Sequence, residues 1–200
     1  MMYRATAVVR EAMDSLPRAD FLPDSLKELA SLDRPLPIGQ GQTNSQPSTV
    51  AIMVDLLEVQ PGQKVLDVGA GSGWTTAILS KLVGPTGSVL GVERQASLIP
   101  AAQEAIARHG GNAEIRLALP GVLGWPDTAP FDRILVSAEA DALPETLVNQ
   151  MGDDAILVIP VSSRMLRVRK HNGSVTVTSH GPFTFVPLIV DPLPKDPPIP

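Results

Sequence analysis

Short runs of consecutive apolar residues alternate along this chain with longer stretches in which apolar residues recur every three or four positions. The consecutive runs predict buried strands, and the wider spacing predicts helices that place one face on a core. Strands are predicted at residues 64–68, 88–93, 113–118, 131–137 and 155–160. Helices are predicted at residues 3–16, 48–58, 75–82, 97–108 and 143–151, with a shorter helical piece at 24–31. Because strands and helices alternate, we expect an α/β fold with a mostly parallel, doubly wound sheet.

The two ends of the chain depart from this alternation. Residues 165–169 and 174–178 alternate apolar and polar side chains around a His-Asn-Gly turn, which predicts an antiparallel hairpin at the sheet edge. Residues 191–200 hold five prolines, so we expect an unpacked tail. Near the N-terminus, the proline-punctuated segments 17–23 and 33–37 cannot form long helices and are expected to cover the domain.

Composition bounds the possible functions. A chain of 200 residues with 44% apolar side chains predicts one domain at residues 1–190, of which residues 1–47 form an N-terminal helix and covering loops. The 16 basic and 21 acidic residues contain no long block of like charge, which disfavours a nucleic-acid partner. The absence of cysteine excludes disulfides, thiolate metal sites and a cysteine nucleophile. The charged N-terminal region predicts neither a signal peptide nor a membrane span, so we expect a cytoplasmic protein.

One predicted strand runs directly into a glycine-rich turn. Residues 64–68 are followed by Gly69-Ala70-Gly71-Ser72-Gly73 and then by a helical pattern, so a ligand can approach the bare backbone and the helix N-terminus. The next strand ends at Glu93, 22 residues after Gly71, where a carboxylate can accept both hydroxyls of a ribose. The Gly-x-Gly-x-Gly spacing differs from the dinucleotide pattern and favours S-adenosylmethionine. The alternative is a glycine turn without a ligand.

The segment before the second helix is unusually polar. Residues 37–47 carry one apolar side chain among many amides and hydroxyls, which would be unfavourable to bury unless these groups were paired. We interpret the segment as a loop that lines a site, and the alternative is a solvated turn.

With these segments placed, the chain resembles the protein-L-isoaspartate O-methyltransferase family over roughly residues 8 to 190. The Gly-Gln-Thr-x-Ser-x-Pro loop at residues 41–47 is similar to the family's signature, whereas the glycine loop alone would indicate only some methyltransferase. The other matching segments are Pro37-Ile38-Gly39, residues 68–74, Glu93-Arg94, residues 124–126, residues 129–132 and Phe185-Val186-Pro187-Leu188.

The resemblance implies a monomer with a seven-stranded, Rossmann-like methyltransferase sheet and rearranged last strands. Its implied activity is methylation, from S-adenosylmethionine, of the carboxylate of L-isoaspartyl residues in damaged proteins. Thr43 and Ser45 would lie beside that carboxylate and the methyl donor, and Pro160, Val161 and Arg164 would border the substrate groove. The implied cofactor contacts are Gln42, Gly69, Ala70, Gly71, Gly73, Glu93 and Arg94. No metal or general base is expected, because an ionised carboxylate is already the nucleophile.

Three departures from the family pattern bear on function. Leu119-Pro120-Gly121 stands where the family has Gly-Asp-Gly, which removes the acceptor for the adenine amino group and predicts weak cofactor binding unless Asp127 or a backbone carbonyl replaces it. Glu139 stands where the family has a small residue, and an inward carboxylate would repel an anionic substrate. Ser162 replaces a glycine in a shortened loop, where Arg164 could compensate Glu139 or bind a different acid.

The leading interpretation is therefore a carboxyl methyltransferase acting on isoaspartyl proteins or peptides. One alternative keeps the chemistry but methylates an aspartate of one dedicated peptide, which Glu139 and the altered loop would favour. Another is a relative that binds a ligand or partner without turnover, which the lost aspartate would favour. A dinucleotide oxidoreductase is disfavoured by the glycine spacing.

Overall fold

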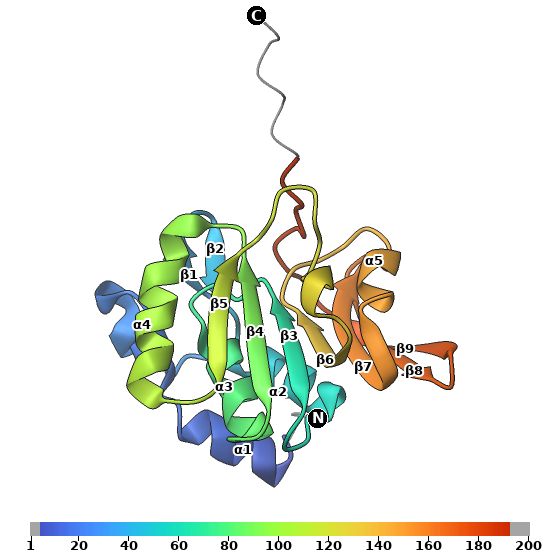
Figure 1. Ribbon diagram of the computed structural model, residues 1–200. Helices are drawn as coiled ribbons and strands as arrows, with labels where there is room; N and C mark the ends of the chain where they lie inside the picture. Colours follow the sequence, from blue (N-terminus) through green and yellow to red (C-terminus); the bar gives the residue numbers. More distant parts are fainter. Residues whose placement is uncertain (1–4, 193–200) are drawn as a thin grey trace, which may run out of the picture.

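The computed structural model describes residues 5–192, whose central element is a seven-stranded sheet of order β5-β4-β3-β6-β7-β8-β9 (Figure 1). The first five strands in this order pair in parallel, and β8 and β9 are added antiparallel. This topology confirms the expected doubly wound methyltransferase sheet with a C-terminal hairpin. The strands are β3 (Lys64–Val68), β4 (Ser88–Glu93), β5 (Ala113–Leu117), β6 (Phe131–Val136), β7 (Met151–Val161), β8 (Arg164–His171) and β9 (Ser174–Pro182).

The two faces of the sheet are covered differently. Val65 joins a core shared with α1 to α4, whereas its neighbour Leu66 joins a second core on the opposite face, closed by α5 and by the loop at residues 118–130. Because successive side chains of a strand point to opposite faces, strands buried on both sides read as continuous apolar runs. The helices are α1 (Ala7–Asp14), α2 (Pro47–Leu57), α3 (Trp74–Val83), α4 (Ile99–His109) and α5 (Glu145–Val148).

The structure corrects the predicted helix at residues 143–151. Only Glu145–Val148 is helical, and Met151 already pairs with Phe131 at the start of β7. Leu147 and Met151 are both buried in the second core, so their apolar spacing fits a helix although a strand contributes the second of them. The predicted strand at 155–160 is correspondingly too short.

The N-terminal covering region contains more regular structure than its prolines indicate. α1 begins at Ala7, where Thr6 accepts a hydrogen bond from the Val9 N–H as N-cap; residues 3 and 4 of the predicted helix lie outside the described residues. Arg18–Phe21 and Asp24–Leu29 form 3₁₀ helices. The polar segment expected as a loop forms a separate hairpin, of β1 (Leu36–Gly39) and β2 (Gln42–Asn44).

The start of the proline-rich tail is not unpacked. The Asp191 carbonyl oxygen accepts a hydrogen bond from the Gly121 N–H at 2.7 Å, and its carboxylate pairs with Arg94. Residues 193–200 of the predicted tail lie outside the described residues.

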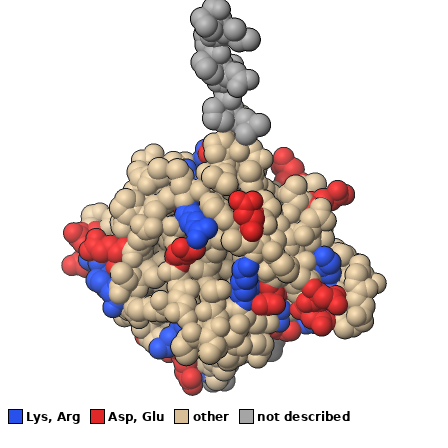
Figure 2. Space-filling model, in the orientation of Figure 1, with Lys and Arg blue, Asp and Glu red and all other residues tan. Residues whose placement is uncertain are grey.

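On the face drawn in Figure 2, acidic and basic side chains are interspersed and do not form a continuous patch of either charge. Within residues 5–192, every helix is too short or too polar to cross a membrane.

Candidate active site

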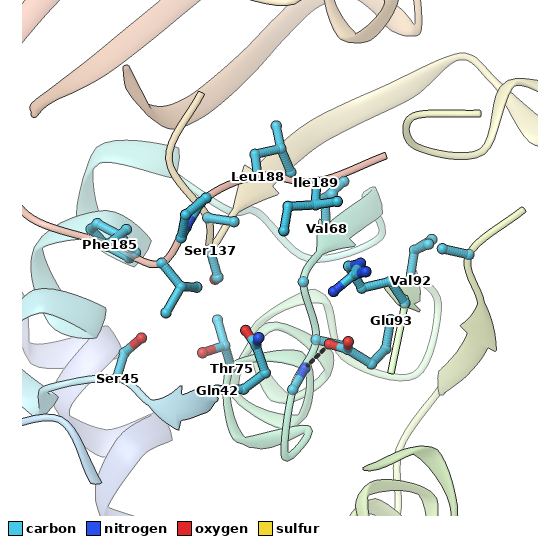
Figure 3. A pocket seen from close by; sticks show the side chains of 18 of the residues that line it. Gln42, Ser45, Val68, Thr75, Val92, Glu93, Ser137, Phe185, Leu188 and Ile189 are labelled. Atoms are coloured by element: carbon cyan, nitrogen blue, oxygen red, sulfur yellow. Dashed lines mark hydrogen bonds between the residues drawn. The ribbon is translucent and has the colours of Figure 1, made fainter. Parts of the chain in front are cut away.

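A cavity of about 360 Å³ opens at the carboxyl ends of the parallel strands. It lies where the chain, having added β4 and β5 on one side of β3, returns to add β6 on the other, which is the usual ligand-binding position of an open α/β sheet. Its walls are the turns after β3, β4, β5 and β6, the β1–β2 hairpin, and residues 184–191, which we call the C-terminal strap. Sequence segments that lie far apart therefore meet at one site (Figure 3).

Glu93 lies at one end of this cavity and is held by the glycine turn. Its two carboxylate oxygens accept hydrogen bonds from the backbone N–H groups of Gly71 and Gln95, both at 2.8 Å, and its side chain is buried (Figure 3). A carboxylate has about four acceptor positions, so two remain after these contacts. Glu93 can therefore still accept hydrogen bonds from two hydroxyl groups of a ligand.

The glycines of the turn have different roles. Gly69, Ala70 and Gly71 line the cavity, whereas Gly73 is not among the lining residues. Gly73 has φ +83°, and a Cβ there would lie 3.1 Å from the Ile106 side chain and 3.2 Å from the Ala102 carbonyl oxygen. Gly73 therefore has a packing role here, in which the absence of a side chain lets α4 approach the start of α3.

The β1–β2 hairpin supplies the opposite end of the cavity. Gln42, Thr43 and Ser45 all line it. Figure 3 shows Ser45 near Phe185 and Ser137, across the cavity from Glu93, with Gln42 and Thr75 between them. The cavity therefore presents a carboxylate at one end and hydroxyl groups at the other.

Arg18 holds this hairpin in place, a role that the sequence reading missed. Its buried guanidinium donates hydrogen bonds to the Asn44 side chain at 2.7 Å and to the Ser45 carbonyl oxygen at 2.9 Å. Further bonds reach the carbonyl oxygens of residues 30, 32, 34 and 44. Burial lowers the pKa of Arg18 to about 10, so the group stays charged at neutral pH. The available signal was an arginine beside Pro17 in a mostly apolar region.

The hairpin is also joined to the cofactor turn. Asn44 donates a hydrogen bond to the Ser72 hydroxyl at 2.9 Å, and Ser72 lines the cavity beside the glycines. Asn44, the buried polar side chain of residues 37–47, is therefore paired on both sides, with Arg18 and with Ser72. Ser72 itself was not predicted as a site residue.

Glu139 is turned away from the cavity. Its carboxylate accepts hydrogen bonds from the Ser163 N–H at 2.8 Å and the Phe185 N–H at 3.4 Å, and Glu139 is not among the lining residues. Repulsion of an anionic substrate by an inward carboxylate is therefore not a feature of this structure. Instead, Glu139 joins the β7–β8 turn to the C-terminal strap.

The predicted substrate-groove residues lie outside the cavity. Pro160, Val161 and Arg164 are not among its lining residues. Pro160 and Val161 are buried at the end of β7, and Arg164 donates to the Ser179 hydroxyl at 2.8 Å instead of contacting Glu139. Because β7 continues to Val161, Pro160 and Val161 belong to the sheet, whereas Arg164 is exposed at the start of β8.

The C-terminal strap is the largest part of the site that the sequence did not locate. Its backbone is fixed to Glu139, three residues after the end of β6, because the Glu139 N–H donates to the Val186 carbonyl oxygen at 2.8 Å and the Leu188 N–H donates to the Glu139 carbonyl oxygen at 2.7 Å. Phe185, Leu188 and Ile189 then face the cavity (Figure 3). The Phe-Val-Pro-Leu sequence was the one signal for it.

The cavity has no ligand set for a metal ion. Within residues 5–192, no group of three or more histidine, aspartate or glutamate side chains is arranged to hold one. The acidic side chains of the cavity wall are Glu93 and Asp191, and its basic side chain is Arg94, which is paired with Asp191. Asp127, considered as an acceptor for adenine, is not part of the wall.

Comparison with known proteins gives a consistent relationship. The family model described as protein-L-isoaspartate(D-aspartate) O-methyltransferase matches residues 2–191. A Methanopyrus kandleri protein named protein-L-isoaspartate O-methyltransferase is 42% identical over 187 residues, which cover 90% of this chain and 83% of the relative. A protein of the same name from Methylorubrum extorquens is also 42% identical, over 92% of this chain and 81% of the relative.

Solved structures agree with this relationship. One protein-L-isoaspartate O-methyltransferase superposes with a TM-score of 0.81 at 25% identity, covering 92% of this chain, and this chain spans 62% of its length. A Plasmodium falciparum structure assigned the same activity, in complex with S-adenosyl-L-homocysteine, gives a TM-score of 0.77 at 25% identity and covers 92% of this chain and 91% of its own. The chain belongs to the protein-L-isoaspartate O-methyltransferase family.

Proposed function

We propose that this protein uses S-adenosylmethionine to methylate the carboxylate of L-isoaspartyl residues in proteins or peptides. The observation that carries the proposal is the cavity itself, which has Glu93 on the glycine turn at one end and the Ser45 hydroxyl at the other. Family membership and a relative in complex with S-adenosyl-L-homocysteine support the same activity.

The residues present fit the cofactor. Glu93 keeps two acceptor positions for ribose hydroxyls, and the bare backbone of Gly69 and Gly71 leaves space beside them. Apolar side chains of Val68 and Val92 line the wall between the ends, and about 360 Å³ is within the range of small-molecule sites. We propose Gln42, Ala70 and Arg94 as further contacts. When bound, S-adenosylmethionine supplies a methyl group carried on a positively charged sulfur.

The chain's own contribution to the reaction is alignment in a dry site. An ionised carboxylate needs no base, so Ser45 and Thr43 act by donating hydrogen bonds that orient the carboxylate oxygen. Phe185 and Leu188 of the C-terminal strap cover this end with apolar surface and exclude water, which strengthens those hydrogen bonds.

The alternative of a dedicated aspartyl peptide loses its main support. That alternative rested on Glu139 and on the altered loop with Arg164. In the structure, the Glu139 carboxylate binds the Ser163 N–H and the Arg164 guanidinium binds the Ser179 hydroxyl, both outside the cavity. We also propose that the protein acts as a monomer in the cytoplasm, without nucleic-acid or membrane partners. The construction of the whole cavity from one chain supports the monomer.

Transfer of labelled methyl from S-adenosylmethionine tests the activity. Two peptides of one sequence, one with L-isoaspartate and one with L-aspartate at the same position, are the acceptors. We expect a base-labile methyl ester on the isoaspartyl peptide, with little label on the aspartyl peptide. Equal labelling of both, or labelling of the aspartyl peptide alone, would contradict the proposed substrate.

A further inference from the structure

The end of the cavity beyond Glu93 is formed by the turns after β4 and β5 and by the last residues of the C-terminal strap. On the proposed function, on which this inference rests, this is where the adenine of the cofactor lies, because Glu93 takes the adjoining ribose. Leu119, Ile189 and Val190 line the cavity although they are 41%, 47% and 41% exposed. A flat aromatic base placed between them would cover this apolar surface.

The turn after β5 lacks a side-chain acceptor for the exocyclic amino group of such a base. Leu119 has an apolar side chain, and Pro120 has no polar side-chain group. The Gly121 N–H is a donor, and it joins this turn to the C-terminal strap by donating to the Asp191 carbonyl oxygen at 2.7 Å. A side-chain acceptor for the amino group must therefore come from another segment.

Asp191 is the acidic side chain at this end. Among the described residues that line the cavity, the acids are Glu93 and Asp191, and Glu93 is assigned to the ribose. Asp191 is fixed by its backbone contact to Gly121 and by an ion pair in which its Oδ1 accepts from Arg94 Nη2 at 2.7 Å. The ion pair leaves Oδ2, which has no hydrogen bond within the described chain, as a free acceptor.

We propose that Asp191 accepts a hydrogen bond from the exocyclic amino group of the adenine and so makes the site specific for an aminopurine. An ionised carboxylate only accepts hydrogen bonds, so it favours an amino group and disfavours a carbonyl oxygen at the same position. Arg94 orients the carboxylate from its other side. Asp191 then compensates for Pro120, and cofactor binding is tighter than the turn at residues 119–121 alone predicts.

The test compares two ligands that differ at that position of the base. S-Adenosyl-L-homocysteine carries the amino group, and S-inosyl-L-homocysteine carries a carbonyl oxygen there. Isothermal titration gives the ratio of their dissociation constants for the wild type, for Asp191→Asn and for Asp191→Ala. Glu114→Gln is the matched control, because Glu114 also pairs with an arginine, Arg116 at 2.7 Å, but does not line this cavity.

We expect the wild type and Glu114→Gln to prefer the adenosyl ligand by at least about tenfold, the range for a hydrogen bond to a charged group. Asp191→Asn keeps an oxygen for Arg94 and the backbone bond to Gly121, but its amide can donate to the carbonyl oxygen. Its preference should fall by about tenfold or more, and Asp191→Ala should also lose the preference. Thermal unfolding identifies any variant that has lost its fold.

The outcomes separate this inference from the proposed function. If the wild type binds the adenosyl ligand and both Asp191 variants keep the wild-type ratio, the role of Asp191 is overturned while the function stands. If the wild type binds neither ligand, the proposed function is overturned and the role of Asp191 with it. A ratio that falls in both Asp191 variants and is unchanged in Glu114→Gln supports the inference.

Discussion

Replacement of Asp67 by asparagine should reduce the loss of folding stability that occurs as the pH rises. Asp67 lies on β3 with no exposed surface; its Oδ2 accepts a hydrogen bond from the Thr76 hydroxyl at 2.6 Å, and its Oδ1 has no partner within the described chain. Burial, and to a smaller degree the nearby charge of Glu93, raise the pKa of Asp67 from 3.8 to about 7. The folded protein therefore disfavours the ionised form.

The sign and size of the effect follow from linkage. Between about pH 4 and pH 7 the folded protein keeps a proton that the unfolded chain has lost, so the free energy of unfolding falls as pH rises through this window. A pKa raised from 3.8 to about 7 corresponds to roughly 4 kcal/mol in total, of which about 3 kcal/mol is lost between pH 5 and pH 8. The amide of the Asp67→Asn variant would not titrate and could still accept from Thr76, so this variant should avoid that loss.

Urea unfolding of the wild type and Asp67→Asn at pH 5 and pH 8 measures this loss of stability. We expect the unfolding free energy of the variant, relative to that of the wild type, to be about 3 kcal/mol higher at pH 8 than at pH 5. Glu104→Gln is the control, because Glu104 is an exposed helix residue paired with Arg108 and should change little. Parallel pH profiles of the unfolding free energy for the wild type and Asp67→Asn would show that burial does not keep Asp67 protonated in the folded protein.

Three further substitutions test the site and its supports. Ser45→Ala should lower kcat by about tenfold or more and leave the affinity for S-adenosyl-L-homocysteine unchanged, because Ser45 lines the cavity and orients the substrate. The control is Ser15→Ala at the end of α1, which should alter neither quantity. Unchanged turnover in Ser45→Ala would contradict the role of Ser45. Arg18→Lys leaves several buried acceptors of the β1–β2 hairpin unpaired, so the free energy of unfolding in urea should fall by about 2–4 kcal/mol. A fall of less than about 0.5 kcal/mol would contradict the role of Arg18. In Gly73→Ala, the alanine would have to adopt φ +83° and place its Cβ 3.1 Å from the Ile106 side chain of α4. Thermal unfolding should therefore show a destabilisation of about 1–3 kcal/mol. An unaltered Tm would argue against the packing role of Gly73.

The parallel half of the sheet was predictable because its signals are local. The strands at residues 64–68 and 88–93 are observed with the predicted bounds, since every residue after the first of each strand is buried. The positions of Gly71 and Glu93 followed from the same strands, because the carboxyl ends of adjacent parallel strands meet at one sheet edge. The hydrogen bond between these residues could not be read from spacing alone.

The remaining parts depend on contacts between distant segments. The β1–β2 hairpin contains one proline and two glycines, which indicate a loop, and its conformation is fixed by Arg18, which lies 26 residues before Asn44. Residues 185–188 of the C-terminal strap match a family segment but carry no predicted site role, and the proline content predicted that Asp191 would be unpacked. Its place beside Gly121 and Arg94 follows from the path of the chain after β9, which no local pattern records.

We propose that the cavity on the glycine turn binds S-adenosylmethionine through Glu93. This role is measured by calorimetric titration of S-adenosyl-L-homocysteine into the wild type and Glu93→Gln, with thermal unfolding to verify that the variant is folded. We predict one site in the wild type and an affinity about 10- to 100-fold lower in Glu93→Gln, because hydrogen bonds to a charged acceptor are lost. Equal affinity in a folded Glu93→Gln protein, or no binding to the wild type, would contradict the account.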